Sequence, residues 1–447
     1  MTKTTTKGQG MRGAFVAVTS LFFMWGFITV LVDALIPRLK EVFELTFLQA
    51  GLVQFAWFAA YGMLSIPGGN LISRIGYQKG ILVGLATAGV GCLLFYPAAA
   101  TRLYPLFLLA LFVVAGGITV LQVAANPYIS VLGPEESASA RLNLSQAFNS
   151  FGTTIAPVVA ASLLLGDQIL GSEAIQALPE AERFAYFAAE ASAVQIPFVV
   201  LALSFFALAG VVGFIKLPKI LGRTTGDEAS SYAQVFQNRK LKFGALAIFV
   251  YVGAEVALGS YMVNYGMSLD IVDAIQSNGF LGSMASLAAL IKGIDVAGLD
   301  AKGVLGALLT FYWGGAMLGR FAGSGLMGWV SPFRLLTLAA LCAVGLIGAS
   351  ISTSGVPALL FLLGVGFFNS VMFPTIFTLA IEDLGEGKPQ GSGLLCTAIV
   401  GGAFIPPAVG ALVDGMGFEA AFLLPMVCYA YIAWYAGRLV PSFSSRS

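Results

Sequence analysis

The sequence predicts an all-α integral membrane protein with twelve transmembrane helices in two pseudo-symmetric six-helix bundles. Three observations predict this fold: an extreme composition, twelve apolar stretches of spanning length, and an uneven distribution of Lys and Arg between them. The chain has 447 residues, of which 58% are hydrophobic and 10% are charged. An ordinary soluble domain has roughly 45–50% apolar and 25% charged residues, so the excess apolar surface here needs lipid as its solvent.

The apolar stretches have the length that a bilayer requires, because a helix crosses the hydrocarbon core with roughly 20 residues. The predicted helices cover 13–36, 49–73, 79–100, 104–132, 142–167, 192–216, 242–268, 303–327, 332–353, 356–381, 391–414 and 418–438. The first stretch is too long for the apolar core of a secretory signal, and we interpret it as an uncleaved first helix.

The basic residues predict the orientation of these helices. Twelve crossings place both termini on one side, and the segments on that side hold 17 Lys and Arg against 6 on the other. The positive-inside rule therefore places the N- and C-termini in the cytoplasm. Arg320 and Arg334 are counted among the 17; we interpret them as topology determinants and, as a second hypothesis, as contacts of a cytoplasmic gate.

The chain divides near its middle, where the polar stretch 217–241 separates two sets of six predicted helices. It predicts an N-terminal six-helix bundle (1–216), a cytoplasmic linker (217–241) and a C-terminal six-helix bundle (242–447). Pro127 and Pro374 fall in the fourth helix of each set, which indicates a weak internal repeat. Duplicated halves with a substrate site near the midplane are one plan of membrane transporters.

Several other classes of function are excluded by what the chain does not contain. It has no His, which removes the commonest general base and imidazole metal ligand. Its four cysteines lie far apart without metal-ligand spacing, and it has no phosphate-binding loop for ATP. With a net charge of +1 and no long basic run, nucleic-acid binding is not indicated. We expect no enzyme activity, cofactor, metal or nucleic-acid partner.

Glu255 is the first candidate site residue, because it lies about thirteen residues into the helix predicted at 242–268. At 1.5 Å per residue this is roughly 20 Å, close to the bilayer midplane. A carboxylate at that depth is costly, and a functional role is the default interpretation. We expect Glu255 to line a water-filled cavity; the alternative is a carboxylate held by neighbouring helices for packing specificity alone.

Asp33 is the second candidate, on the first predicted helix with Trp25 and Thr29 at four-residue spacing on the same face. An aromatic ring, a hydroxyl and a carboxylate in one stripe suit a sugar, whose C–H face packs on a ring while its hydroxyls bond to the acid. The alternative is an ordinary solvated carboxylate at the membrane interface, since Pro37 and Arg38 follow shortly.

Amide side chains recur on several predicted helices and indicate a polar cavity. Amides both donate to and accept from hydroxyls, and Pro127 also frees the Val123 carbonyl to accept a hydrogen bond. The alternative for any one of them is a hydrogen bond between helices. The candidates are Gln122, Asn126, Gln146, Asn149 and Asn369, with Gln54, Trp57 and Tyr61 on the second helix.

Four segments together resemble the fucose/galactose/glucose:cation symporter family of the major facilitator superfamily. They are Phe-Phe-Met-Trp-Gly-Phe at 22–27, Gln-Val-Ala-Ala-Asn-Pro-Tyr at 122–128, Arg-Leu-Asn-Leu-Ser-Gln-Ala-Phe-Asn-Ser at 141–150 and Tyr-Val-Gly-Ala-Glu at 251–255. The resemblance spans nearly the whole chain. It implies a sugar importer of a bacterial inner membrane that works by alternating access.

The resemblance also implies roles for single residues. In the fucose–proton symporters of that family, an acid on helix one contacts the sugar and an acid on helix four carries the proton. Asp33 occupies the first place, but Gln122 occupies the second and cannot take up a proton. The presence of Glu255 resembles the glucose/galactose branch of the family. Coupling is therefore expected to use Asp33, Glu255 or a sodium ion held by carboxylate and amide oxygens.

These observations predict a monomeric importer of a hexose, with glucose or galactose first and fucose or N-acetylglucosamine next, coupled to a proton or a sodium ion. The expected sugar-binding residues are Trp25, Asp33, Gln122, Asn126, Gln146, Asn149, Glu255 and Asn369. The alternative is a multidrug or lipid exporter of the same superfamily, which would need a more apolar cavity with fewer paired amides. A membrane enzyme would need an activated nucleophile or a metal, and a sensor would need a signalling domain. We find neither in this sequence.

Overall fold

The structure is a computed structural model that describes residues 2–42, 47–164, 177–215, 217–218, 232–291 and 299–439. Side chains are described over these ranges except at 2–10, 32–42, 47–51, 158–164, 187–188, 190–194 and 439. The described residues form helices and their connections, with no strand among them. The predicted all-α class is therefore confirmed for this part of the chain.

The described helices form two groups by their packing. The first group consists of α1 (Thr2–Val42), α2 (Phe47–Ile75), α3 (Tyr77–Thr101), α4 (Tyr104–Val131), η1 (Glu135–Ser137), α5 (Ala138–Leu164) and α7 (Glu180–Phe214). The second group begins after the short α8 (Tyr232–Val235) and consists of α9 (Arg239–Ser268), α10 (Val272–Ser277), α11 (Gly279–Ile291), α12 (Ala301–Leu326), α13 (Pro332–Ile351), α14 (Val356–Asn369), α15 (Met372–Ile381), η2 (Glu382–Gly387), α16 (Lys388–Thr397), η3 (Ala398–Val400), α17 (Gly401–Met416), α18 (Phe418–Ala421), α19 (Leu423–Trp434) and η4 (Tyr435–Leu439).

Eight described stretches are long and apolar enough to cross a membrane. One of them, Val356–Met416, has 61 residues and exceeds a single crossing. Three further helices, α2, α5 and α12, are 29, 27 and 26 residues long and carry polar side chains such as Gln54, Asn149 and Arg320. These polar residues lower the hydropathy of three helices that also contribute to the centre of the molecule.

The helices differ in places from the predicted spans. The tenth predicted helix is divided at Ser370–Val371 into α14 and α15, whereas the fourth runs through Pro127 without a break. The predicted sixth helix is part of a longer one, because α7 already begins at Glu180. Two short helices, α10 and α11, lie in the stretch between the predicted seventh and eighth spans.

Two prolines leave backbone carbonyls free to bond other helices. A proline lacks an N–H, so the carbonyl four residues earlier has no helical partner. The Val123 carbonyl, four residues before Pro127, accepts a hydrogen bond of 2.9 Å from Ser392 Oγ of α16. The Ser370 carbonyl, four residues before Pro374, accepts one of 3.1 Å from Arg320 Nε. The Val123 carbonyl, which the sequence predicts to be free, therefore accepts a hydrogen bond that joins α4 to α16.

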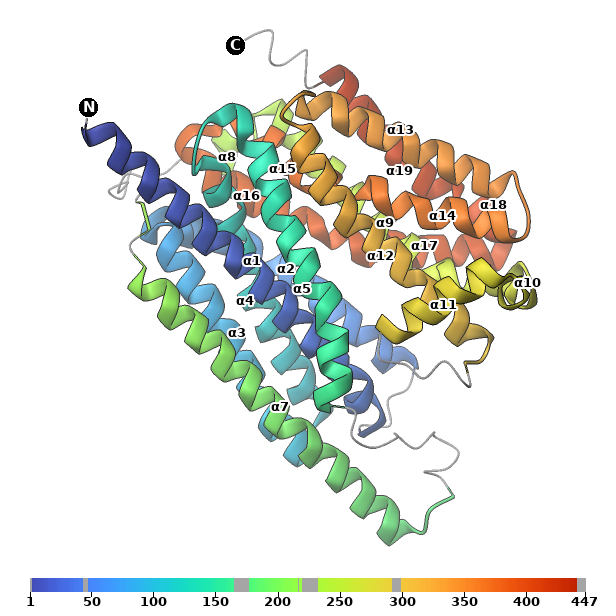
Figure 1. The fold of residues 1–447 in the computed structure, drawn as a ribbon. Helices are drawn as coiled ribbons and strands as arrows, with labels where there is room; N and C mark the ends of the chain where they lie inside the picture. Colours follow the sequence, from blue (N-terminus) through green and yellow to red (C-terminus); the bar gives the residue numbers. More distant parts are fainter. Residues whose placement is uncertain are drawn as a thin grey trace.

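The two groups pack together toward one end of the bundle, which we call the terminal end because α1 begins there and η4 ends there (Figure 1). In the described part of the chain, α2 packs along α16 and η3, and α5 packs along α12 and α15. By contrast, α1 and α9 pack extensively only within their own groups. The described packing between the groups thus lies mainly at the terminal end and the centre.

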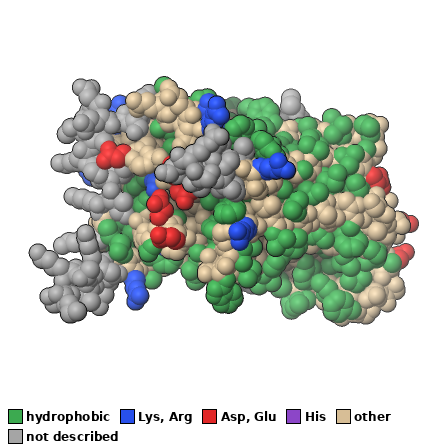
Figure 2. Space-filling view, turned by 90° about the horizontal axis from the view of Figure 1, so that it is seen from above, with side chains coloured by type: hydrophobic (Ala, Val, Ile, Leu, Met, Phe, Trp, Pro, Cys, Tyr) green, Lys and Arg blue, Asp and Glu red, His purple; other side chains and the backbone are tan. Residues whose placement is uncertain are grey.

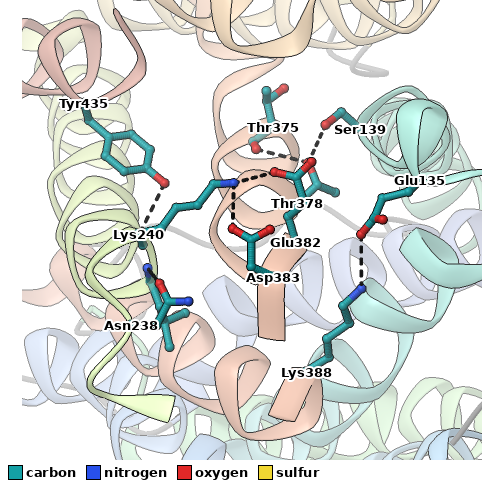
Figure 3. Close-up of polar contacts among 11 residues, drawn as sticks. Glu135, Ser139, Asn238, Lys240, Thr375, Thr378, Glu382, Asp383, Lys388 and Tyr435 are labelled. Carbon is teal, nitrogen blue, oxygen red and sulfur yellow. Dashed lines mark hydrogen bonds and ion pairs between the residues drawn. The ribbon is translucent and has the colours of Figure 1, made fainter. Parts of the chain in front are cut away.

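Polar contacts join the groups at the terminal end, where charged side chains gather on the surface in Figure 2. Ser139 of α5 and Thr378 of α15 are 2.6 Å apart through their hydroxyls, and Asn143 Nδ2 donates to Thr375 Oγ1 at 3.1 Å. Figure 3 shows the nearby ion pair between Glu135 and Lys388, at 3.8 Å. The groups are therefore held together by hydrogen bonds that would have to break before this end could open.

Candidate functional site

A cavity of about 180 Å³ lies between the two helix groups near the middle of the molecule. The first group lines it from α1, α2, α4 and α5, and the second from α9, α12, α15 and η3. Its lining residues are Trp25, Tyr61, Gln122, Gln146, Asn149, Tyr251, Val252, Glu255, Arg320, Phe373 and Ile399. Amides, one carboxylate, one guanidinium and four aromatic rings therefore converge from eight elements.

Five of the predicted sugar-binding residues line this cavity: Trp25, Gln122, Gln146, Asn149 and Glu255. Their amides also bond to protein groups, which fixes their orientation. Gln122 Nε2 donates to the Tyr61 hydroxyl at 2.6 Å, and Asn149 Nδ2 donates to the Phe22 carbonyl at 2.9 Å. Each amide retains an oxygen that can accept a hydrogen bond from a ligand hydroxyl.

Two other predicted residues lie behind the lining. Asn126 is fully buried, and its Oδ1 accepts a hydrogen bond of 3.3 Å from Gln146 Nε2. Asn369 is also fully buried and donates from Nδ2 to the Tyr312 hydroxyl at 2.6 Å. Asn126 therefore supports the cavity-lining Gln146. Asn369 supports Tyr312, whose hydroxyl donates to the Glu255 carbonyl. The backbone of Asp33 belongs to α1, but its side chain lies outside the described residues.

Glu255 is held at the cavity by contacts on both its side chain and its backbone. Its Oε1 accepts a hydrogen bond of 2.8 Å from the Tyr251 hydroxyl, one turn earlier on α9. Its carbonyl accepts one of 3.3 Å from the Tyr312 hydroxyl of α12. The carboxylate therefore has a defined orientation. Among the described residues, none donates a hydrogen bond to its second oxygen, Oε2.

Arg320 is the cavity residue that the sequence analysis assigned to another role. It was counted among the topology-determining basic residues, but the structure places it inside α12, lining the same cavity as Glu255. Its Nε donates to the Ser370 carbonyl, and its Nη1 donates to Ser150 Oγ of α5. The signal that could have found it is a charge inside a predicted spanning segment, the same signal that identified Glu255.

A larger cavity of about 630 Å³ lies at the terminal end. Exposed carboxylates and the residues that connect α12 to α13 line much of it, among them Glu135, Glu382 and the exposed Trp329. We place the candidate site in the smaller, central cavity, because buried polar groups from both helix groups converge there. That cavity presents both hydrogen-bond donors and acceptors together with aromatic faces, which is the chemistry that recognises a polyhydroxylated ligand.

Comparison with known proteins agrees with this architecture. A family model described as Major Facilitator Superfamily matches residues 14–399. A glucose/galactose transporter of Brucella abortus is 45% identical over 433 residues, which cover 97% of this chain and 95% of the relative. An L-fucose-proton symporter of Escherichia coli is 33% identical over 429 residues, which cover 94% of this chain and 92% of the relative.

Solved structures show the same fold. A crystal structure of the transporter FucP in the outward conformation has a TM-score of 0.83 and 32% identity, covering 95% of this chain and 97% of that chain. A second structure, of the Escherichia coli fucose:proton symporter, has a TM-score of 0.84 and 31% identity over 96% and 98% of the two chains. The predicted membrane-transporter fold is confirmed. The chain belongs to the Major Facilitator Superfamily and, within it, to the family of the glucose/galactose transporters and L-fucose-proton symporters, and it is a transporter rather than an enzyme.

Proposed function

We propose that this protein imports a hexose across a bacterial inner membrane by cation-coupled alternating access, with glucose or galactose as the first candidates. The observation that carries the proposal is the central cavity, where Gln122, Gln146 and Asn149 face Glu255 and Arg320 across the interface between the helix groups. A site between two groups is reachable from one side and then from the other if the groups rock about it.

The sugar-binding role of the cavity is supported by its chemistry. The lining amides supply acceptors for ligand hydroxyls, Arg320 supplies donors for ring and hydroxyl oxygens, and Trp25 supplies an apolar face for the C–H groups of a sugar. The relatives named as glucose/galactose transporters support a hexose as the ligand. Asp33 remains a proposed sugar ligand from its place on α1.

Glu255 is the proposed coupling residue, together with Asp33. A carboxylate in a membrane-spanning helix can bind a proton, or a sodium ion with neighbouring oxygens. Gln122 is not a carboxylate, so α4 offers no cation-binding acid at that position. The cation is therefore assigned to Glu255 and Asp33. The relatives named as proton symporters support coupling to a cation and leave a proton and a sodium ion as the two candidates.

We also propose the orientation and domain division predicted from the sequence. The terminal end would face the cytoplasm, with halves at 1–216 and 242–447 joined by the linker 217–241. Packing between the helix groups at the terminal end supports an outward-open conformation, as does the similarity to FucP in its outward conformation. A monomer is the proposed unit of transport.

The test is uptake of radiolabelled glucose, galactose, fucose and N-acetylglucosamine into proteoliposomes, with a proton gradient or a sodium gradient imposed separately. Accumulation of one hexose above its external concentration under one gradient would support the proposal and identify both substrate and cation. Folded protein that accumulates none of them, but extrudes a fluorescent drug in a sugar-independent manner, would replace it with the exporter alternative.

The coupling residue is tested by Glu255→Gln, which keeps the size of the side chain and removes its charge. We expect loss of accumulation against a gradient while exchange of labelled for unlabelled hexose continues. Unchanged accumulation in both Glu255→Gln and Asp33→Asn would overturn the assignment of coupling to these carboxylates.

A further inference from the structure

Arg320 connects the central cavity to the interface between the two helix groups. It lines the cavity from α12 of the second group, and its Nη1 donates a hydrogen bond to Ser150 Oγ on α5 of the first group. Ser150 is only 5% exposed, so this bond lies inside the protein. A ligand in the cavity can therefore touch a side chain that also joins the two groups.

The position of the guanidinium is set by the second group. Arg320 Nε donates to the Ser370 carbonyl, which is free because Pro374 cannot bond to it. The backbones of α12 and α14 approach closely here, since a Cβ at Gly319 would collide with the Phe367 carbonyl oxygen. Arg320 is thus fixed on its own side by one bond, while the bond to Ser150 is the one that crosses the interface.

Neighbouring contacts show that this interface must separate if the terminal end opens. Ser324 Oγ donates to the Ala140 carbonyl at 3.0 Å, and the rings of Phe148 and Phe321 are 5.7 Å apart edge to face, both between α5 and α12. Among the residues that make these described contacts between α5 and α12, Arg320 is the one that also lines the central cavity.

A sugar in the cavity offers oxygens that compete for the same donors. A guanidinium has five N–H groups, and here the described contacts of its terminal nitrogens include the neutral hydroxyl of Ser150. Glu255 shares the cavity, but its Oε1 is engaged by Tyr251. Ligand oxygens placed between Arg320 and the amides of the first group could replace the Ser150 hydroxyl as acceptors.

We propose that Arg320 and Ser150 form a sugar-sensing latch: without substrate their hydrogen bond keeps the terminal end closed, and sugar releases it by taking over the guanidinium donors. This inference rests on the proposed function for the identity of the ligand. Arg320 would then bind substrate, and Ser150 would be a positioning residue that acts through Arg320. A cation bound at Glu255 alone would leave the latch in place, which would limit movement of the cation without sugar.

The experiment measures how fast a cysteine at the terminal end reacts with a maleimide in purified, detergent-solubilised protein. Met327→Cys is the reporter, because Met327 is 9% exposed and its Sδ contacts Asn143 Nδ2 of the first group at 3.6 Å. The four native cysteines are replaced by Ala, and this background without the reporter gives the baseline. Ser150→Ala is compared with Ser145→Ala, a buried Ser on the same helix whose hydroxyl contacts Thr19 within the first group at 3.0 Å.

Without sugar, we expect Ser150→Ala to react about tenfold faster than the reporter protein, because a hydrogen bond to a charged group is lost. Ser145→Ala should react at the unmodified rate, and Ser150→Thr, which keeps the hydroxyl, should restore slow labelling. Glucose or galactose should accelerate the reporter protein and have little further effect on Ser150→Ala.

Equal sugar-free rates in Ser150→Ala and Ser145→Ala would overturn the latch, whether or not a sugar binds. Failure of every hexose to bind to the folded reporter protein, with fast sugar-free labelling of Ser150→Ala, would instead overturn the proposed substrate and the sensing of sugar while keeping the closure by Ser150. Lower thermal stability in Ser150→Ala without faster labelling would show a structural role only and would also overturn the proposal.

Discussion

The hydroxyl of Tyr251 donates a hydrogen bond of 2.8 Å to Oε1 of Glu255, one turn further along α9. Tyr251 is only 1% exposed, so the bond is shielded from water and orients the carboxylate toward the cavity. The donated hydrogen bond stabilises the charged form of the carboxylate and so opposes binding of a proton. Without the hydroxyl, the carboxylate takes up a proton more readily.

We therefore expect Tyr251→Phe to lower the proton concentration that gives half-maximal uptake by about tenfold, since a hydrogen bond to a charged group contributes about 1.5–3 kcal/mol. Cation dependence of uptake in proteoliposomes measures this. Tyr265→Phe is the matched control, because Tyr265 is a buried residue of the same helix whose hydroxyl bonds to the Ser350 carbonyl at 3.3 Å. Equal cation dependence in both variants would contradict a role for Tyr251.

Most of the fold could be predicted from the sequence, because lipid demands long apolar helices and each leaves a clear signal. The details that escaped prediction depend on contacts between helices. The break at Ser370–Val371 coincides with the carbonyl that Arg320 binds, and α7 continues to Glu180 through residues outside any apolar window. Such features follow from tertiary partners that a hydropathy pattern does not contain.

The candidate site was predicted in part, for a related reason. A charge in an apolar helix identified Glu255, but Arg320, inside the predicted helix 303–327, was interpreted as a topology determinant because basic residues were assigned to topology first. The recurrence of amides on the predicted helices identified Asn126 and Asn369, yet it could not show that the first bonds to the cavity-lining Gln146 and the second to Tyr312. Asp33 stays a prediction, since its side chain is not among those described.

The position of Asn369 leads to a prediction that separates a sugar ligand from a support. Asn369 bonds to Tyr312, and Tyr312 bonds to the Glu255 carbonyl, so Asn369→Ala leaves a buried hydroxyl with one partner fewer. An unsatisfied buried group costs about 1–3 kcal/mol. We expect a lower melting temperature and a hexose affinity within about twofold of the original.

Gln146→Ala is the comparison for Asn369→Ala, because Gln146 lines the cavity and is also buried. It should weaken equilibrium binding of hexose by about tenfold, the usual value of one well-placed hydrogen bond or slightly more. A large loss of affinity in Asn369→Ala, at unchanged melting temperature, would return Asn369 to the set of direct sugar ligands.

Closure of the terminal end depends on two glycines at a crossing of α2 and α16. A Cβ at Gly69 would lie 2.8 Å from the Pro389 carbonyl oxygen, and a Cβ at Gly393 would lie 2.8 Å from the Ser65 carbonyl oxygen. Backbone atoms cannot move aside as a flexible side chain can, so the helices would have to separate. Burial raises the pKa of the nearby Tyr232 hydroxyl, which therefore stays protonated and keeps donating to the Ile66 carbonyl at 2.7 Å.

We expect Gly69→Ala to shift the population away from the conformation closed at the terminal end. In the Met327→Cys reporter, labelling should become about tenfold faster. This corresponds to a loss of about 1.4 kcal/mol in the free energy that favours the closed conformation, within the usual cost of overpacking. Gly345→Ala makes the same chemical change where no neighbouring atom lies within 4 Å, and it should label at the original rate. Slow labelling in Gly69→Ala would show that the crossing relaxes without opening.

A buried lysine joins two elements of the second group, α9 and η2, near the terminal end. Lys240, at the start of α9, is 3% exposed, and its Nζ lies 2.5 Å from Glu382 and 3.2 Å from Asp383, both in η2 (Figure 3). The two carboxylates are 38% and 47% exposed and so remain in contact with water. The segment η2 leads directly into Lys388, the partner of Glu135 in the other group.

This difference in exposure predicts an asymmetric response to removal of either side of the cluster. Lys240→Met leaves two carboxylates that water can solvate, whereas the double variant Glu382→Gln with Asp383→Asn leaves a buried ammonium without a counter-charge. An uncompensated buried charge costs about 3–5 kcal/mol, and replacing the buried cation by an apolar side chain of similar size costs far less. Thermal melting of the purified protein should therefore show a small decrease for Lys240→Met and a large one for the double variant. Equal decreases would mean that Lys240 is hydrated in solution, and a larger decrease for Lys240→Met would mean that its main role is to bring η2 against α9.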